Sequence, residues 1–138
     1  MPMTMKQILQ KTPPSRKDKA QYCVIREARV MDKDYGHIQT TIYKAKVYST
    51  HDAQGNKHRG PRNVYVATVE VHKKQVVVSC SCQDFCFTFE VALSKKKAAR
   101  IEYSNGELPV DRNPRMIPGC CGHLFKFGSA LVAKKRVE

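Results

Sequence analysis

The amino-acid sequence predicts an α+β fold in which a small antiparallel β-sheet is followed by two helices. Apolar residues alternate with polar ones through much of the stretch 22–79, as expected of half-buried strands. After residue 82 the apolar spacing becomes that of an amphipathic helix. The chain has 138 residues, which is the length of one domain. We therefore expect the sheet and the helices to form a single compact domain.

Residues 1–20 are expected to form a basic, proline-containing N-terminal arm. The stretch from Thr12 to Asp18 contains two prolines and several charged side chains. Such a composition offers too little apolar surface to fold alone. We therefore predict a mobile segment that a partner would hold in place.

Residues 21–75 form the predicted β-rich region, in which alternating or β-branched runs occur at 22–30, 38–47 and 64–71. The alternation slips by one residue at Ile42 and Tyr43, so we expect a β-bulge there. A hairpin loop is predicted at 51–62, because this stretch is rich in turn-forming residues. A fourth strand, at 75–79, would follow a tight turn.

Residues 76–138 combine the last strand with two predicted helices. Asp84 is expected to cap the first helix, which would end near Lys97. A short strand is predicted at 101–103, and three prolines should keep 109–118 irregular. The second helix should begin near Cys121 and end on cations, which the helix dipole favours there.

The chain is strongly basic, with 25 Lys and Arg against 12 Asp and Glu, a net charge of +13. This excess favours a polyanionic partner such as nucleic acid or an acidic protein face over a membrane surface. The sequence has neither an apolar run long enough to span a membrane nor an apolar N-terminal signal. We expect a protein that is neither secreted nor membrane-bound.

Six cysteines suggest a metal site rather than a disulfide framework, because no secretory signal is present. Cys80 and Cys82 are two apart at a strand end, and Cys121 and His123 are two apart at a helix start. Zinc prefers four such ligands in a tetrahedron. Either of the neighbouring cysteines could replace a ligand; these are Cys86 and Cys120. Cys23 is expected to be a buried apolar residue.

The pattern Cys80-Ser-Cys82-Gln-Asp-Phe85 followed by Cys121-Gly-His123-Leu124 resembles the SWIM-type zinc finger. The resemblance covers residues 76 to about 133. It implies one structural Zn²⁺ on a ββα unit, with Cys80, Cys82, Cys121 and His123 as ligands. The 38 residues between the two ligand pairs, 83–120, form an insertion longer than in most members.

Two further segments, 101–107 and 113–119, resemble small SWIM-like proteins of tailed bacteriophages. This narrower resemblance implies a structural or accessory virion component, located in the virion or the host cytoplasm. Its partners would be other virion or assembly proteins, with DNA as a further contact.

The sequence contains no catalytic motif, and a zinc ion with four protein ligands has no open position for water. We therefore predict a non-enzymatic protein with no small-molecule substrate. The alternative is a basic zinc-finger protein that binds nucleic acid or regulates its use. Its expected contacts, which could equally serve an acidic protein partner, are Lys57, Arg59, Arg62, Lys95, Lys96, Lys97, Arg100, Lys134, Lys135 and Arg136.

Overall fold

The computed structural model of the chain describes residues 2–35, 38–51, 56, 57, 63–102, 104 and 106–137, without the side chains of 33–35, 38 and 39. Four antiparallel strands form one sheet in the order β1-β2-β3-β4, and helices precede and follow it. The predicted α+β fold is confirmed. In chain order the elements are α1 (Met5–Lys11), α2 (Pro14–Ala20), β1 (Cys23–Tyr35), β2 (Ile38–Ser49), β3 (Tyr65–His72), β4 (Gln75–Cys80), the π-helical turn η1 (Phe85–Phe89), α3 (Glu90–Lys95) and α4 (Gly122–Ala133).

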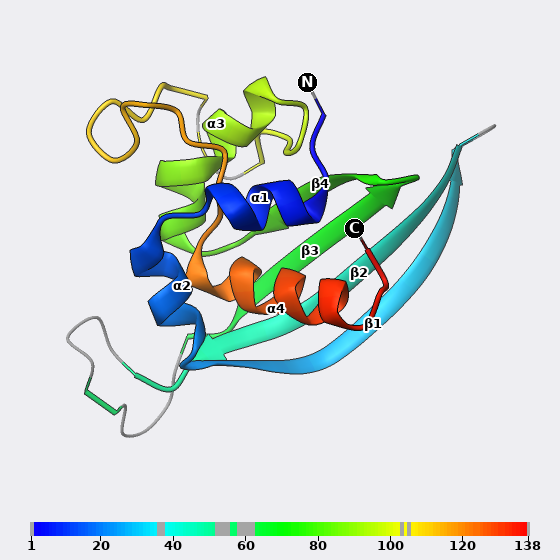
Figure 1. Cartoon of the computed structure of the whole chain (residues 1–138), viewed down its shortest axis with the longest axis horizontal. Helices are drawn as coiled ribbons and strands as arrows, with labels where there is room; N and C mark the ends of the chain where they lie inside the picture. Colours follow the sequence, from blue (N-terminus) through cyan, green and yellow to red (C-terminus); the bar gives the residue numbers. More distant parts are fainter. Residues whose placement is uncertain are drawn as a thin grey trace.

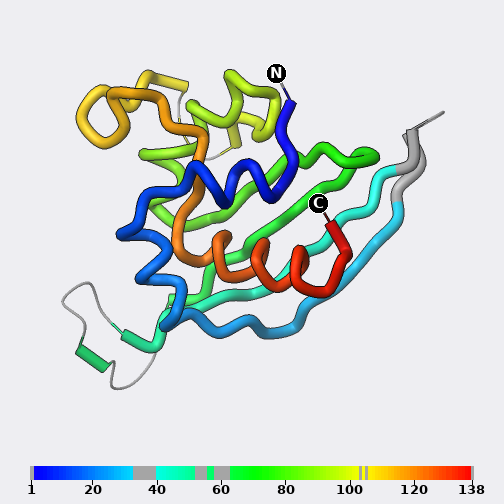
Figure 2. Tube along the Cα trace, in the orientation of Figure 1, coloured from blue at the N-terminus to red at the C-terminus, as the bar shows by residue number. Residues whose placement is uncertain are grey.

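The core lies between one face of the sheet and α4, which crosses the sheet and contacts all four strands (Figure 1). The residues buried on this side include Ala45 and Val47 of β2, and every second residue of β4, as in Val78. These side chains share one apolar cluster with Leu124 and Phe127 of α4. The chain trace in Figure 2 shows α1 alongside α4 over the same face.

The outer edge of β4 is covered by backbone from two distant segments. The amide of Val76 donates to the carbonyl of Met3 at 2.9 Å, and the amide of Val78 donates to the carbonyl of Ala98 at 2.8 Å. An exposed strand edge is a template for aggregation. The N-terminal segment and the residues just after α3 therefore help to cover this edge of the sheet.

The N-terminal segment is folded, so the prediction of a mobile arm is wrong. Thr4 and Gln7 form a capping box at the start of α1, and Pro14 occupies the first turn of α2, where its missing N–H is harmless. Met5 and Ile8 are fully buried in the core. Local capping and these apolar residues outweigh the polar composition.

The predicted bulge at Ile42 and Tyr43 is also wrong, because β2 pairs without interruption through both residues. The register shift lies in the neighbouring strand β1, between Arg26 and Arg29. The slip in the pattern of β2 has another cause. Ile42 is buried on the face opposite to Ala45 and Val47, so the strand has buried positions on both faces.

The predicted helix after Cys82 is present, but it begins as the π-helical turn η1 before α3. Asp84 does not cap it through its side chain. Ile101 and Glu102, the described residues of the predicted 101–103 strand, are not in a strand, and Tyr103 lies outside the described residues. The segment 107–120 is irregular as expected, and Asn113 holds it through hydrogen bonds to Thr88 and Ile117.

None of the helices in the described part of the chain has the length and apolar character needed to cross a lipid bilayer.

Gly119 lies against the backbone of Thr12, so a substitution there measures how closely the N-terminal segment packs. A Cβ at this position would lie 2.7 Å from Cα of Thr12, a backbone atom that cannot move aside alone. We expect Gly119→Ala to lower the free energy of unfolding by about 1–3 kcal/mol, as overpacking does. Chemical denaturation measures this change, and Lys6→Ala, exposed on α1, is the control. An unchanged midpoint for Gly119→Ala would contradict the close packing of this segment.

Candidate metal centre

The end of β4 directs two thiols to the helical side of the sheet. Val76, Val78 and Cys80 alternate as buried residues along the strand, and the pairing of Cys80 with Ala67 places its side chain on the α4 side. Ser81 extends the pairing, since its hydroxyl accepts from the amide of Val66 at 2.9 Å and its own amide donates to the Val66 carbonyl. Cys82 follows at the point where the strand gives way to η1.

Two of the thiols lie at helix starts, where backbone N–H groups favour negative charge. The sulfur of Cys82 accepts from the amide of Phe85 at 3.4 Å. Cys121 is the N-cap of α4, and its sulfur accepts from the amide of Leu124 at 3.5 Å. A thiolate is stabilised at such a position. Cys82, rather than Asp84, thus supplies a side-chain acceptor for the helix that follows it.

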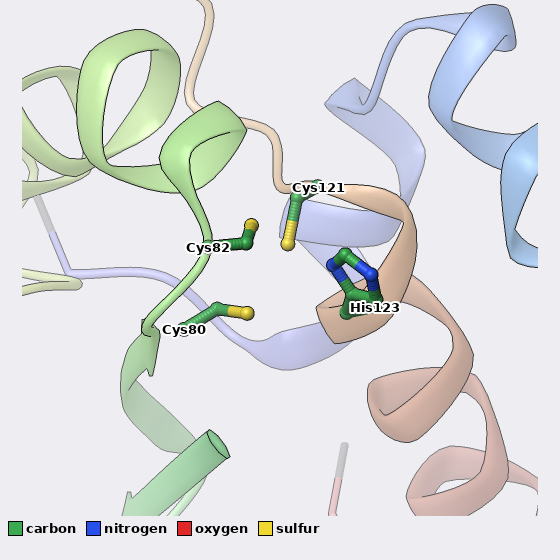
Figure 3. Close-up of side chains that lie close together, drawn as sticks. All are labelled: Cys80, Cys82, Cys121 and His123. Carbon is green, nitrogen blue, oxygen red and sulfur yellow. The ribbon is translucent and has the colours of Figure 1, made fainter. Parts of the chain in front are cut away.

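The structure brings together all four residues predicted as ligands, Cys80, Cys82, Cys121 and His123, and all four are buried. Their candidate ligand atoms lie within 4.8 Å of one another. A tetrahedron with metal–sulfur bonds of about 2.3 Å has sulfur–sulfur edges of about 3.8 Å, so only a small contraction is needed. Figure 3 shows the three sulfur atoms and the imidazole turned toward a common point.

The imidazole of His123 fits a metal ligand. Its Nδ1 atom is buried and has no hydrogen-bond partner among the described residues. A buried polar atom without a partner is costly, and coordination of a metal would satisfy it. The ring lies at a centroid distance of 4.8 Å from that of Tyr65 on β3, which helps to fix its orientation.

The electrostatics of the three thiols depend on one another. Burial and hydrogen bonding to Cys80 and Cys82 raise the pKa of Cys121 well above its usual range. Hydrogen bonds from Cys121 and Cys80 instead lower the pKa of Cys82. Of these two thiols, Cys82 is therefore the one whose surroundings favour the thiolate. A divalent cation would displace the remaining thiol protons, because only the thiolate is a good ligand.

Arg16 on α2 lies near Cys82 and Cys121 and binds Asp84, two residues after Cys82. Its guanidinium donates two hydrogen bonds to the Asp84 carboxylate, at 2.7 and 3.0 Å. The pKa of Arg16 is raised first by Asp84 and also by the nearby Cys121 and Cys82. Three thiolates, one neutral imidazole and a divalent metal carry a net charge of −1, which Arg16 helps to balance. Arg16 was not among the residues predicted from sequence, because residues 1–20 were expected to form a mobile arm.

The remaining cysteines, Cys23, Cys86 and Cys120, lie outside the four-residue group. All six cysteines are among the described residues, and none forms a disulfide bond there. Cys120 shares a hydrogen bond with the Thr12 hydroxyl at 3.5 Å, and burial raises its pKa to about 12. Burial also raises the pKa of Cys86, and it raises that of Cys23 to about 11. Cys23 is buried, as predicted.

The predicted basic contacts occupy separate parts of the molecule. Lys57 pairs with His51 in an isolated β-bridge after β2, and Arg59 and Arg62 fall outside the described residues. Arg100 is 2.6 Å from the Glu70 carboxylate, so its charge is already paired. Exposed cations follow two helices: these are Lys95, Lys96 and Lys97 at the end of α3, and Lys134, Lys135 and Arg136 after α4.

Comparison of the chain with protein-family models, curated proteins and solved structures found no match. The four buried side chains could hold a metal ion, and this is the chemistry that the geometry supports.

Adjacent cysteines provide a matched test of the metal centre. We expect Cys121→Ser to lose bound metal and to unfold at a much lower temperature, because a structural site contributes about 10–16 kcal/mol in small fingers. Cys120→Ser should retain one metal per chain, since Cys120 lies outside the group. Elemental analysis and thermal unfolding measure both effects. Full metal content and wild-type stability in Cys121→Ser would refute the assignment.

The raised pKa values of Cys23 and Cys120 predict low reactivity in the native state. At pH 8 a thiol with a pKa of about 11 has about 100-fold less thiolate than one with its usual pKa. We expect iodoacetamide to leave both residues unmodified in the metal-loaded protein. A chelator should then expose Cys80, Cys82 and Cys121 to alkylation. Peptide mapping by mass spectrometry identifies the modified sites; rapid labelling of Cys120 before chelation would contradict its burial.

Proposed function

We propose that this chain is a non-enzymatic zinc-binding protein in which the metal fixes the fold. The observation that carries the proposal is the set of four buried ligands, Cys80, Cys82, Cys121 and His123. Three thiolates and an imidazole are a donor set typical of structural zinc. Four protein ligands leave no position for a substrate or a reactive water. The role of the metal is then to join β4 to α4.

We further propose that the centre is a SWIM-like ββα unit. Cys80 and Cys82 come from the end of a β-hairpin, β3–β4, and Cys121 and His123 come from the start of α4. This arrangement supports the resemblance based on the Cys-x-Cys and Cys-x-His pairs. The insertion between them contains η1, α3 and an irregular segment that leads back to α4.

The proposed role is that of a structural or accessory virion protein of a tailed bacteriophage, which docks onto other virion or assembly proteins. The support comes from the resemblance of segments 101–107 and 113–119. Much of their described part is exposed, including Ile101 and Glu107, and residues near them also expose apolar side chains. Phe87, Leu108 and Val110 are 52, 58 and 68 % exposed. The N-terminal segment no longer supports docking, because it packs against its own chain.

Nucleic-acid binding is the second candidate function, and the net charge of +13 favours it. Cations that neutralise phosphates release condensed counterions, so binding weakens as salt rises. If the protein contacts about five phosphates, the logarithm of the affinity should fall with the logarithm of salt concentration with a slope of about −4.5.

The metal and the virion role can be tested separately. X-ray absorption of the purified protein should give zinc with three sulfur ligands and one nitrogen ligand; a different metal or a shell dominated by oxygen would contradict the proposed site. Quantitative mass spectrometry of particles, from the phage that encodes the chain, should find a fixed copy number. Absence from purified particles would rule out the virion role while leaving the metal site intact.

A further inference from the structure

The face of the sheet opposite α4 carries four clustered cations. On β2, Lys44 and Lys46 are exposed and alternate with the buried Ala45 and Val47. The register places Arg26 of β1 directly opposite Lys46, and Arg29 directly opposite Lys44. Residues that are directly opposite in a sheet share a face. We call these four exposed residues the basic quartet: Arg26, Arg29, Lys44 and Lys46.

The bulge in β1 is what brings Arg29 to this face. Residues three apart on a regular strand point to opposite faces. Between Arg26 and Arg29, however, β1 advances three residues while β2 advances two, so both arginines face the same side. The bulge requires Glu27 to adopt a φ of 51°, a left-handed conformation that is unfavourable for a residue with a side chain. Bulges commonly re-aim a side chain in this way.

The quartet is unfavourable for the fold itself. Like charges directly opposite each other destabilise a sheet, and here two such pairs are adjacent. Glu27 offsets part of this by pairing with Lys46 at 2.8 Å, but both side chains are more than half exposed, so the pair is weak. On the same face Glu70 is paired with Arg100. Glu70 and Glu102 both line a hollow of ≈ 220 Å³ together with Lys44 and Arg100, so two acidic groups and one further cation lie beside that end of the quartet.

We propose that the basic quartet binds the phosphate backbone of duplex DNA, an inference that deepens the nucleic-acid-binding function proposed above. The two cation pairs lie two residues apart along β2, about 6.8 Å, which resembles the spacing of neighbouring phosphates. Guanidinium groups bind phosphate through paired hydrogen bonds. The Arg26 guanidinium lies 5.5 Å from the centre of the Tyr48 ring, which holds it against the sheet. An anionic partner would relieve the repulsion that the fold leaves in place.

The test uses the full-length, metal-loaded chain and a short mixed-sequence DNA duplex. The variant Arg29→Gln with Lys44→Gln removes two charges from the quartet. The control, Lys6→Gln with Lys17→Gln, removes two exposed charges from α1 and α2. The control and the quartet variant therefore have the same net charge. We expect the quartet variant to bind about 10- to 60-fold more weakly at 0.1 M salt, with a salt slope reduced by about 1.8. The control should change much less.

Thermal unfolding separates binding from folding. Because the quartet repels itself, its variant should be as stable as the wild type or slightly more stable. Equal DNA affinity and slope in the two variants would overturn the proposed surface while leaving nucleic-acid binding intact. If the wild type does not bind the duplex at low salt, both the proposed surface and the nucleic-acid-binding function are overturned. Binding of polyglutamate but not of DNA would assign the face to an acidic protein instead.

Discussion

The joint between sheet and helix is formed by two pairs of candidate metal ligands, which meet although 38 residues separate them in sequence. Cys80 and Cys82 end the sheet, and Cys121 and His123 begin the helix that covers it. A domain of this size has a total stability of about 5–15 kcal/mol, which is comparable to the contribution of a structural metal in small fingers. If a metal is bound, the joint between sheet and helix is the strongest local constraint in the molecule. Without a metal, the same joint is a cluster of buried polar groups.

The N-terminal helices form the outer support of this joint. The Thr12 hydroxyl accepts from the amide of Cys120 at 3.1 Å, which fixes the residue before the ligand Cys121. Arg16 binds Asp84, two residues after Cys82. A Cβ on Gly122 would lie 3.2 Å from side-chain atoms of Lys19, so α2 packs closely against the start of α4. The N-terminal helices therefore pack beside both pairs of candidate ligands and are part of the folded domain.

The four residues of the candidate metal site could be predicted from sequence because they form two closely spaced pairs of residue types that bind metals, and the structure brings them together. Strand alternation likewise located all four strands, since burial against one helix leaves a regular pattern. The N-terminal segment was mispredicted because its composition was weighed without its local signals. Thr4 and Gln7 form a capping box, and Met5 and Ile8 lie on one helix face. Tertiary burial then decided the outcome. The bulge was assigned to the wrong strand because a change of buried face and an inserted residue disturb alternation in the same way.

The two faces of the sheet differ in what they contribute. One face packs against α4 and provides the core, so the fold does not need a second layer of helices on the other. The exposed part of the other face, around the basic quartet, is then free to carry charges that a buried surface would exclude. The bulge at Glu27 places this residue in a left-handed conformation and brings Arg29 to the same face as Arg26. Neither feature stabilises the isolated chain. Backbone strain of this kind is found at functional sites, and at Glu27 it lies beside the basic quartet, which supports the proposed contact of this face with an anionic partner.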